Sequence, residues 1–225
     1  MTLRDFGWLV VLGAIWGASY LFLRVATGVL GAFVLIDLRV WIAAGMLLLY
    51  AWWIGHRVAL RSRWRALLVL GAINAALPFT FIASATLHLN ASIAAILNAT
   101  TPFFGAIVAA IWLKERLDRK KLLGLALGLA GVAVLVGWNP LGASPGVVLG
   151  VVFSLAGALC YGIAGVYSKV TFPGIASLDL AIGQQLAAGL WLLPFALATA
   201  QRAPLTLGVV VAVLALALLS TAVGY

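Results

Sequence analysis

The chain has 225 residues, of which 65% are hydrophobic and 8% are charged, and its formal net charge is +9. In a soluble domain roughly a quarter of the residues are charged, so this composition excludes a soluble domain with a fully water-exposed surface. In a bilayer the lipid tails solvate apolar side chains, and the backbone must be satisfied internally. Continuous apolar runs of about 18 to 24 residues fit spanning helices, so the chain is predicted to be an all-α polytopic membrane protein.

Eight apolar segments follow one another along the chain. We expect them at 6–25, 32–54, 66–85, 91–113, 122–138, 146–168, 178–199 and 207–225. The single cysteine, Cys160, lies inside the sixth segment, so no internal disulfide is expected.

The basic residues in the gaps between these segments predict the orientation. If the chain crosses the membrane at every segment, eleven Lys and Arg residues lie on one side and Arg202 alone lies on the other. The eleven are Arg4, Arg57, Arg61, Arg63, Arg65, Lys114, Arg116, Arg119, Lys120, Lys121 and Lys169. Cytoplasmic loops carry an excess of Lys and Arg, so we expect a cytoplasmic N-terminus in the plasma (inner) membrane. The spread of these charges among short gaps argues against nucleic acid as a partner.

An internal repeat relates the first segment to the sixth, with a constant offset of 145 residues. The matched pairs are Trp16 with Tyr161, Gly17 with Gly162, Arg24 with Lys169, and Arg39 with Gln184. Five segments precede the second copy, and five is odd, so the two copies are expected to have opposite orientations. Inverted repeats of this kind are typical of secondary transporters.

The repeat also predicts the domain organisation. Residues 1–138 form a first repeat of five helices, and residues 146–225 form a second, incomplete repeat of three helices. We therefore expect an inverted five-plus-five repeat that is truncated in its second half, and a reading frame that continues beyond Tyr225.

Polar residues in the third and fourth segments share a pattern. Asn74 lies four residues before Pro78, and Asn98 lies four residues before Pro102. A proline cannot donate to the carbonyl four residues earlier, so helix kinks are expected here, with freed carbonyls at membrane depth. One interpretation is a substrate cavity lined by discontinuous helices, with Thr101 contributing a hydroxyl. The other is that Thr and Asn satisfy backbone groups at ordinary kinks.

Aromatic and hydroxyl residues of the first segment are further candidates for the cavity. Trp16, Ser19 and Tyr20 are three or four residues apart, so they fall on or near one helix face. Trp16 lies near the middle of its segment, where an interfacial aromatic belt does not reach. Tyr161, its repeat partner, is expected to face the same cavity.

Two arginines near the outer ends of the first two segments have two interpretations. Arg24 and Arg39 could form a cluster that attracts an anionic substrate. Alternatively, both could extend to the lipid headgroups, which is the interpretation that the sequence favours. Gln184 and Gln185 are uncharged and lie deeper, and one of them is expected to face the cavity, with Gln184 as the candidate.

Glycines four residues apart predict close packing between helices, because small residues let backbones approach one another. The pairs are Gly13/Gly17, Gly124/Gly128 and Gly146/Gly150. Contacts within the chain are expected first, and the choice between monomer and homo-oligomer stays open.

Catalytic and cofactor motifs are missing from the sequence. His56 and His88 have no second His or carboxylate at metal-ligand spacing. The sequence contains no P-loop, and its serines lack a companion base. We therefore expect no enzymatic activity, no cofactor and no metal site.

Four stretches carry a resemblance to a known family. They are Trp16-Gly17-Ala18-Ser19-Tyr20, the stretch from Ser92 to Glu115, the stretch from Gly124 to Gly131, and the stretch from Tyr161 to Lys169. Together they resemble the EamA-type branch of the drug/metabolite transporter superfamily. The resemblance implies ten helices in two inverted halves, a substrate cavity between the halves, and export of amino acids or other metabolites.

The favoured function is therefore a secondary transporter that exports a small metabolite, an amino acid or related compound, across the inner membrane by alternating access. Coupling to a proton or another ion stays open. One alternative is a structural or assembly subunit, which should lack polar residues at mid-membrane. Another is a membrane-embedded lipid enzyme, which should show a cluster of His or acidic residues.

Overall fold

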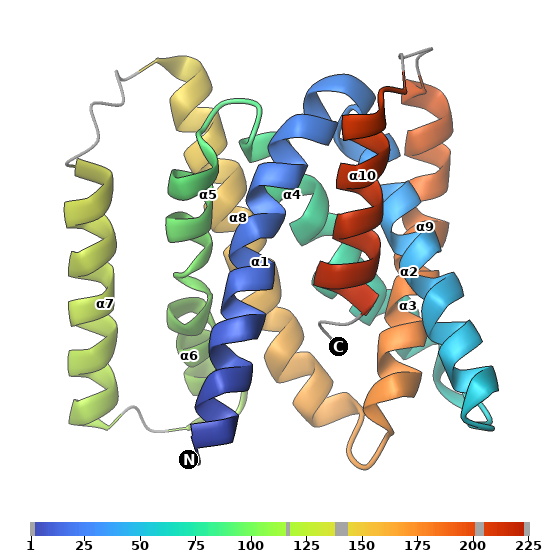
Figure 1. Ribbon diagram of the computed structural model, residues 1–225. Coiled ribbons are helices and arrows are strands. Elements are labelled where there is room, and N and C mark those ends of the chain that lie inside the picture. The colour runs from blue at the N-terminus through green and yellow to red at the C-terminus, as the bar shows by residue number, and fades with distance from the viewer. Residues whose placement is uncertain (1–2, 116–117, 138–143, 201–204, 223–225) are drawn as a thin grey trace.

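The structure is a computed structural model that describes residues 3–115, 118–137, 144–200 and 205–222. Within these ranges the regular secondary structure is entirely helical, which confirms the predicted all-α fold (Figure 1). Four residues used in the predictions lie outside the described residues. They are Arg116 and Arg202 of the charge pattern, and Trp138 and Tyr225 at the boundaries of the repeats.

Each of the eight apolar segments is helical over most of the residues that the structure describes. The uninterrupted ones are α1 (Leu3–Leu30), α2 (Ala32–Trp53), α7 (Arg119–Gly137), α8 (Pro145–Thr171) and α9 (Ser177–Thr199). The third segment comprises α3 (Trp64–Gly71), the π-helix η2 (Ala72–Ala76) and α4 (Leu77–Ala85), and a short 3-10 turn, η1 (Arg61–Arg63), precedes it. The fourth comprises α5 (Ala91–Asn98) and α6 (Thr101–Trp112), and the eighth comprises α10 (Leu207–Ala215) and the π-helix η3 (Leu216–Ala222).

Six helical stretches of the described chain are long and apolar enough to cross a membrane. They are Asp5–Leu30, Ala32–Trp53, Trp64–Ala85, Ala91–Trp112, Pro145–Thr171 and Ser177–Thr199. The eighth segment, Leu207–Ala222, is a shorter apolar helix. The 19-residue helix α7 lies at one edge of the bundle, with its axis along the same direction as its neighbours (Figure 1). The polytopic membrane architecture is therefore confirmed.

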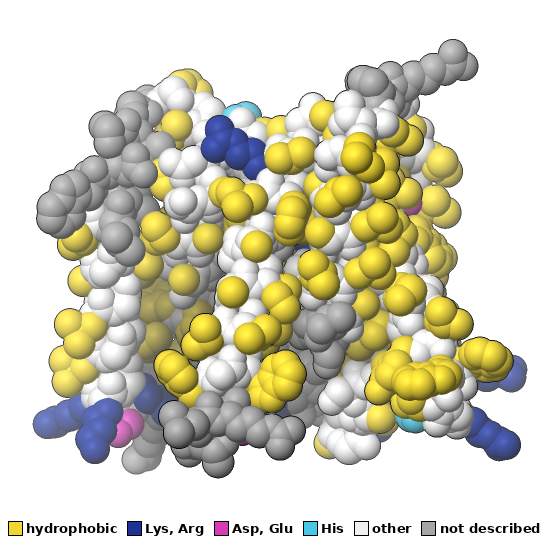
Figure 2. All heavy atoms as spheres, in the orientation of Figure 1, with side chains coloured by type: hydrophobic (Ala, Val, Ile, Leu, Met, Phe, Trp, Pro, Cys, Tyr) yellow, Lys and Arg dark blue, Asp and Glu magenta, His cyan; other side chains and the backbone are white. Residues whose placement is uncertain are grey.

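Side chains are sorted along the axis of the bundle. On the face shown in Figure 2, hydrophobic side chains cover the middle, and most of the visible Lys and Arg side chains extend from the lower end. Charged groups are costly at the centre of a bilayer, so a membrane protein needs this separation. The distribution supports the predicted orientation, in which the end that is lower in Figure 2 faces the cytoplasm. This orientation stays a prediction.

Pro78 changes the helix geometry of the third segment. A proline lacks the N–H that would bond to the carbonyl four residues earlier. The preceding turn widens into η2, which contains Asn74, and the chain then continues as α4 with Pro78 fully buried. The expected proline irregularity thus takes the form of a π-helical turn, which is frequent at functional sites.

Pro102 divides the fourth segment into two helices. α5 ends at Asn98, and α6 begins at Thr101 with the proline in its first turn. The Thr100 hydroxyl donates to the Leu97 carbonyl over 2.6 Å, and the Thr101 hydroxyl donates to the Asn98 carbonyl over 2.7 Å. The Leu97 carbonyl also accepts from the Thr100 backbone nitrogen, whereas the Asn98 carbonyl loses its donor to Pro102 and is satisfied by the Thr101 hydroxyl, as a membrane-embedded break requires.

Only one of the predicted glycine pairs lies in a close helix contact. A Cβ added at Gly150 would lie 2.7 Å from a side-chain carbon of Leu89. At Gly13/Gly17 and Gly124/Gly128 an added Cβ would meet no atom of the described chain within 4 Å. These two pairs lie on exposed faces of α1 and α7 and make no close helix contact within the described chain, so packing at these pairs stays a prediction.

The N-terminal and C-terminal parts of the chain pack against each other. α8 contacts α4 and α6, and α9 contacts α2 and α3. In Figure 1, α1 runs from the lower to the upper end of the bundle, whereas α8 runs from the upper to the lower end. These opposite directions support the inverted repeat of residues 1–138 and 146–225, which stays a prediction.

Candidate functional site

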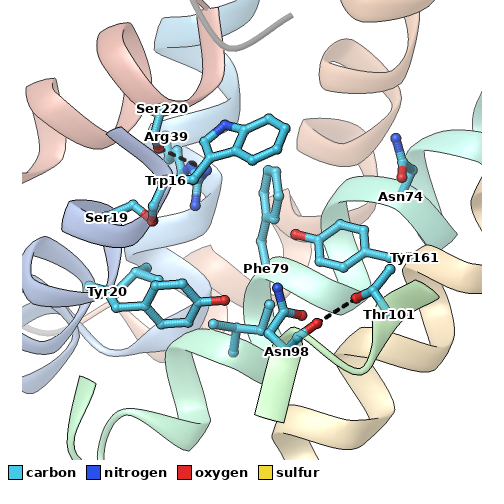
Figure 3. Close-up of a pocket in the computed structure, with 12 residues that line it drawn as sticks. Trp16, Ser19, Tyr20, Arg39, Asn74, Phe79, Asn98, Thr101, Tyr161 and Ser220 are labelled. Atoms are coloured by element: carbon cyan, nitrogen blue, oxygen red, sulfur yellow. Dashed lines mark hydrogen bonds between the residues drawn. The ribbon is translucent and has the colours of Figure 1, made fainter. Parts of the chain in front are cut away.

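A cavity of about 430 Å³ lies among α1, α2, α4, α5, α6, α8 and the two π-helices. Its lining combines aromatic, amide, hydroxyl and aliphatic side chains with one guanidinium (Figure 3). The lining residues are Trp16, Ser19, Tyr20, Leu23, Arg39, Asn74, Phe79, Ile82, Asn98, Thr101, Tyr161 and Ser220. The volume falls within the usual range of small-molecule pockets, about 300 to 1,000 Å³.

Seven of the eight residues predicted to bind substrate lie in this lining. They are Trp16, Ser19, Tyr20, Asn74, Asn98, Thr101 and Tyr161. Gln184 does not line the cavity. It is buried on α9, where its Oε1 accepts a hydrogen bond of 2.6 Å from Asn74 Nδ2. Gln184 therefore fixes the Asn74 side chain from outside the cavity lining.

Helix α1 supplies one wall of the cavity through residues on a single face. The Ser19 hydroxyl donates to the Trp16 carbonyl, so it is held against its own helix. Tyr20 is buried, whereas the Trp16 side chain is about half exposed, at 49%. Trp16 therefore lies at the rim of the cavity, and Tyr20 lies within it.

The break between α5 and α6 supplies another part of the cavity wall. Asn98 is the last residue of α5, and its side-chain Oδ1 is buried without a hydrogen-bond partner in the described chain. Figure 3 shows the polar ends of Tyr20, Asn98 and Tyr161 turned toward the same space. A buried amide oxygen that faces a cavity can accept a hydrogen bond from a bound molecule.

Arg39 is placed differently from the favoured sequence prediction. The snorkelling interpretation is wrong for Arg39, because its side chain is 6% exposed and lines the cavity. Its Nε donates to Thr221 Oγ1 over 2.7 Å, and its Nη2 donates to Ser220 Oγ over 3.2 Å. Arg24 is exposed on α1 and is not in the lining, so the two arginines do not form a cluster in this cavity.

Two features of the site were missed in the sequence. Ser220 and Thr221 are adjacent hydroxyl residues inside an apolar segment, and a search for polar residues at membrane depth would have found them. Phe79 carries no such signal, since a phenylalanine in an apolar segment is ordinary. Its place in the cavity follows from the packing of α4 alone.

The lining favours binding over bond-making chemistry. Among the lining residues the charged group is a guanidinium, which stays protonated and is a poor general base. In the part of the chain that the structure describes, no group of three or more His, Cys, Asp or Glu side chains is placed to hold a metal ion. What the cavity offers is neutral hydrogen-bonding groups, aromatic surface and one positive charge.

The fold and the cavity define a multi-pass helical membrane protein with a polar-lined pocket between its spans. The chain belongs to the EamA-like transporter family, whose family profile matches residues 6–137. The resemblance to the EamA-type branch of the drug/metabolite transporter superfamily is thereby confirmed.

One relative and one solved structure are similar to this chain. An uncharacterized transporter of Bacillus subtilis (strain 168), YvbV, is 28% identical over 193 residues, which cover 81% of this chain and 62% of that protein. This chain thus spans less than two thirds of the length of that relative. A solved crystal structure shares the fold with a TM-score of 0.73 at 21% identity, over 96% of this chain and 74% of the other.

The family points to a transporter rather than an enzyme. The apolar helices of the described chain agree with a lipid bilayer as its environment.

Proposed function

We propose that this protein is a secondary transporter that exports a small metabolite, an amino acid or related compound, across the inner membrane by alternating access. The observation that carries the proposal is the cavity, because polar side chains converge there from helices that are apolar elsewhere. Intramembrane polar groups are costly and usually mark a substrate or ion path. The direction of transport rests on the family resemblance.

The position of the helix breaks supports this function. Transporters with inverted repeats bind substrate near the bilayer midplane, beside discontinuous helices. Here the π-helix η2 brings Asn74 to the cavity, and the break after α5 brings Asn98 and Thr101. The same groups argue against a purely structural subunit, for which buried polar atoms would carry a cost and no benefit.

Contacts at one end of the bundle support alternating access. His56 Nε2 lies 2.7 Å from Asp179 Oδ1, and Lys169 Nζ lies 3.2 Å from Glu115 Oε1. Arg63 also donates to the Thr171 carbonyl. Each contact joins the first expected repeat to the second, at the end predicted to be cytoplasmic. They would have to break for the cavity to open toward the cytoplasm.

The test compares small molecules in the medium of cells that carry or lack the encoding gene. We expect at least one metabolite to accumulate in the medium only when the protein is present, and this difference to shrink with Trp16→Ala. Trp52→Ala is the matched control, because Trp52 is 77% exposed and lies outside the cavity lining. Identical metabolite profiles at equal expression would contradict the proposal.

A further inference from the structure

Four exposed arginines lie at the end of the bundle where the chain passes from α2 to α3. They are Arg57, Arg61, Arg63 and Arg65, and together they are called the arginine edge below. The chain from Ile54 to Arg63 contains no Asp or Glu. Neither of the ion pairs found among the described residues includes an arginine of this edge. The surface therefore carries charge of one sign.

The other basic gap on the same predicted side has a mixed composition. Between Trp112 and Leu122 the Lys and Arg residues are interspersed with Glu115 and Asp118. Lys169 Nζ also lies 3.2 Å from Glu115 Oε1, so part of this charge is paired. The arginine edge is thus the better candidate for a partner of negative charge.

Apolar anchors hold the arginine edge in place. Val58 and Leu60 are half-buried and pack against a cluster of buried residues on α2 and α9, whereas Arg57 and Arg61 are exposed. His56 Nε2 lies 2.7 Å from Asp179 Oδ1, which joins the same segment to the start of α9, and the Asp179 side chain is buried. The arginines are therefore presented to the outside by a segment that is fixed on its inner side.

Aromatic residues place this edge at the boundary of the membrane. Trp53 ends α2 and Trp64 begins α3, and both are exposed. The Tyr50 and Trp53 ring centroids are 6.2 Å apart, and the Arg65 guanidinium carbon lies 5.2 Å from the Trp64 ring. Exposed Trp and Tyr residues are enriched at the level of the lipid headgroups.

Charge, aromatic surface and apolar surface follow one another toward the middle of the bundle. Leu49 lies four residues before Trp53 on the same helix face, is exposed, and is nearer the middle of α2 (Figure 1). At the lower end in Figure 2, Lys and Arg side chains project beside hydrophobic side chains. This order matches the headgroup, the interface and the acyl chain of a phospholipid. A soluble acidic partner would match the charge alone.

We propose that the arginine edge binds anionic phospholipids of the leaflet at this end of the protein, with the lipid phosphates against the guanidinium groups. The planar guanidinium fork matches a phosphate group in geometry, whereas an ammonium acts as a point charge. Clusters of basic residues next to a membrane helix attract anionic lipids for the same electrostatic reason. Lipid binding at this surface does not depend on the transport function proposed above.

The experiment counts bound lipids on the purified, detergent-solubilised protein by native mass spectrometry. Dioleoyl phosphatidylglycerol and dioleoyl phosphatidylcholine share their acyl chains and differ in net charge, and each is titrated separately. We expect phosphatidylglycerol to bind roughly ten-fold or more tightly, since several basic residues contribute to its binding. A higher salt concentration should reduce this preference, because salt screens exposed charges.

Two variants that remove the same charge assign the effect to the arginine edge. Combined Arg57→Gln, Arg61→Gln and Arg65→Gln should remove most of the preference for phosphatidylglycerol. Arg63 is left in place, because it donates to the Thr171 carbonyl.

The matched control changes the other basic gap. Combined Lys114→Gln, Lys120→Gln and Lys121→Gln should keep most of the preference. If the triple glutamine variant does not fold, replacing the same three arginines by Lys keeps the charge, loses the planar fork and should give an intermediate preference.

Three outcomes would overturn the proposal. The first is equal affinity for the two lipids, and the second is an equal loss of preference in the two triple glutamine variants. The third is displacement of phosphatidylglycerol by an equal concentration of glycerol 1-phosphate, which would indicate a site for free phosphate esters. A preference that is lost with the arginines and kept in the lysine-gap control would uphold the lipid site, whatever the transport assay shows.

Discussion

Asn74 and Asn98 carry the same amide four residues before a proline, yet their surroundings differ. Asn74 Nδ2 donates to Gln184 Oε1, so this amide is part of a contact between η2 and α9. The Oδ1 of Asn98 is buried and has no partner in the described chain. Leaving such an atom unsatisfied costs roughly 1 to 3 kcal/mol, a cost that a bound substrate could offset.

This difference predicts unequal effects for matched substitutions. Asn98→Leu keeps a similar volume and removes a buried, unpaired oxygen together with the hydrogen bond between Asn98 and Tyr20, so the two contributions oppose each other and the thermal stability of the protein should change less than in Asn74→Leu while transport falls. Asn74→Leu leaves the Gln184 amide without its partner and should lower the free energy of unfolding by about 1 to 3 kcal/mol. Thermal melting in detergent, paired with the metabolite assay, measures both. Full transport by Asn98→Leu would contradict a contact between Asn98 and the substrate and would leave Asn98 with a role in the helix break alone.

Helix α8 approaches α6 closely at Gly162. A Cβ added there would lie 2.7 Å from the backbone nitrogen of Gly105 and 2.9 Å from the carbonyl carbon of Phe104. Backbone atoms cannot move aside as a flexible side chain can. Small residues let membrane helices pack at such distances, so this glycine sets the separation of two elements that flank the cavity.

Gly17, which is the repeat partner of Gly162, provides a matched control for this contact. Gly162→Ala should lower the free energy of unfolding by about 1 to 3 kcal/mol, as overpacking does. Gly17→Ala should be neutral or slightly stabilising, because nothing in the described chain lies within 4 Å of the added Cβ and alanine favours the helix. The melting temperatures of the two variants in detergent test this prediction. Equal decreases in melting temperature would show that the close contact at Gly162 does not require a glycine.

The orientation of the whole molecule follows from the charge bias, and it can be tested with single cysteines. In a Cys160→Ser background, Leu205→Cys should react with a membrane-impermeant maleimide in intact cells. Arg57→Cys should react only after permeabilisation. Both positions are exposed and lie at opposite ends of the predicted topology. Labelling of residue 57 in intact cells and of residue 205 only after permeabilisation would invert the predicted orientation. Labelling of both residues from the same side would contradict the opposite directions of the repeats.

Much of the fold and part of the site could be predicted from the sequence, because the signals are local. A run of about 20 apolar residues favours a spanning helix wherever it occurs, so the eight segments between residues 6 and 225 are predicted without knowledge of their neighbours. Likewise, Asn98 before Pro102 marks a helix break from chain geometry alone. Trp16, Ser19 and Tyr20 were grouped by helical spacing, and they line the same cavity.

The environment of Arg39 was decided by tertiary structure alone. An arginine close to a helix end can reach the headgroups or turn inward, and the choice depends on which helices stand beside it. Here η3 provides Thr221 and Ser220, some 180 positions along the chain, and α4 provides the Phe79 ring. In the same way Gln184 supports Asn74 from outside the cavity rather than lining it. Hydropathy and helical spacing determined which residues enter the membrane, whereas the packing of helix faces determined which side chains meet there.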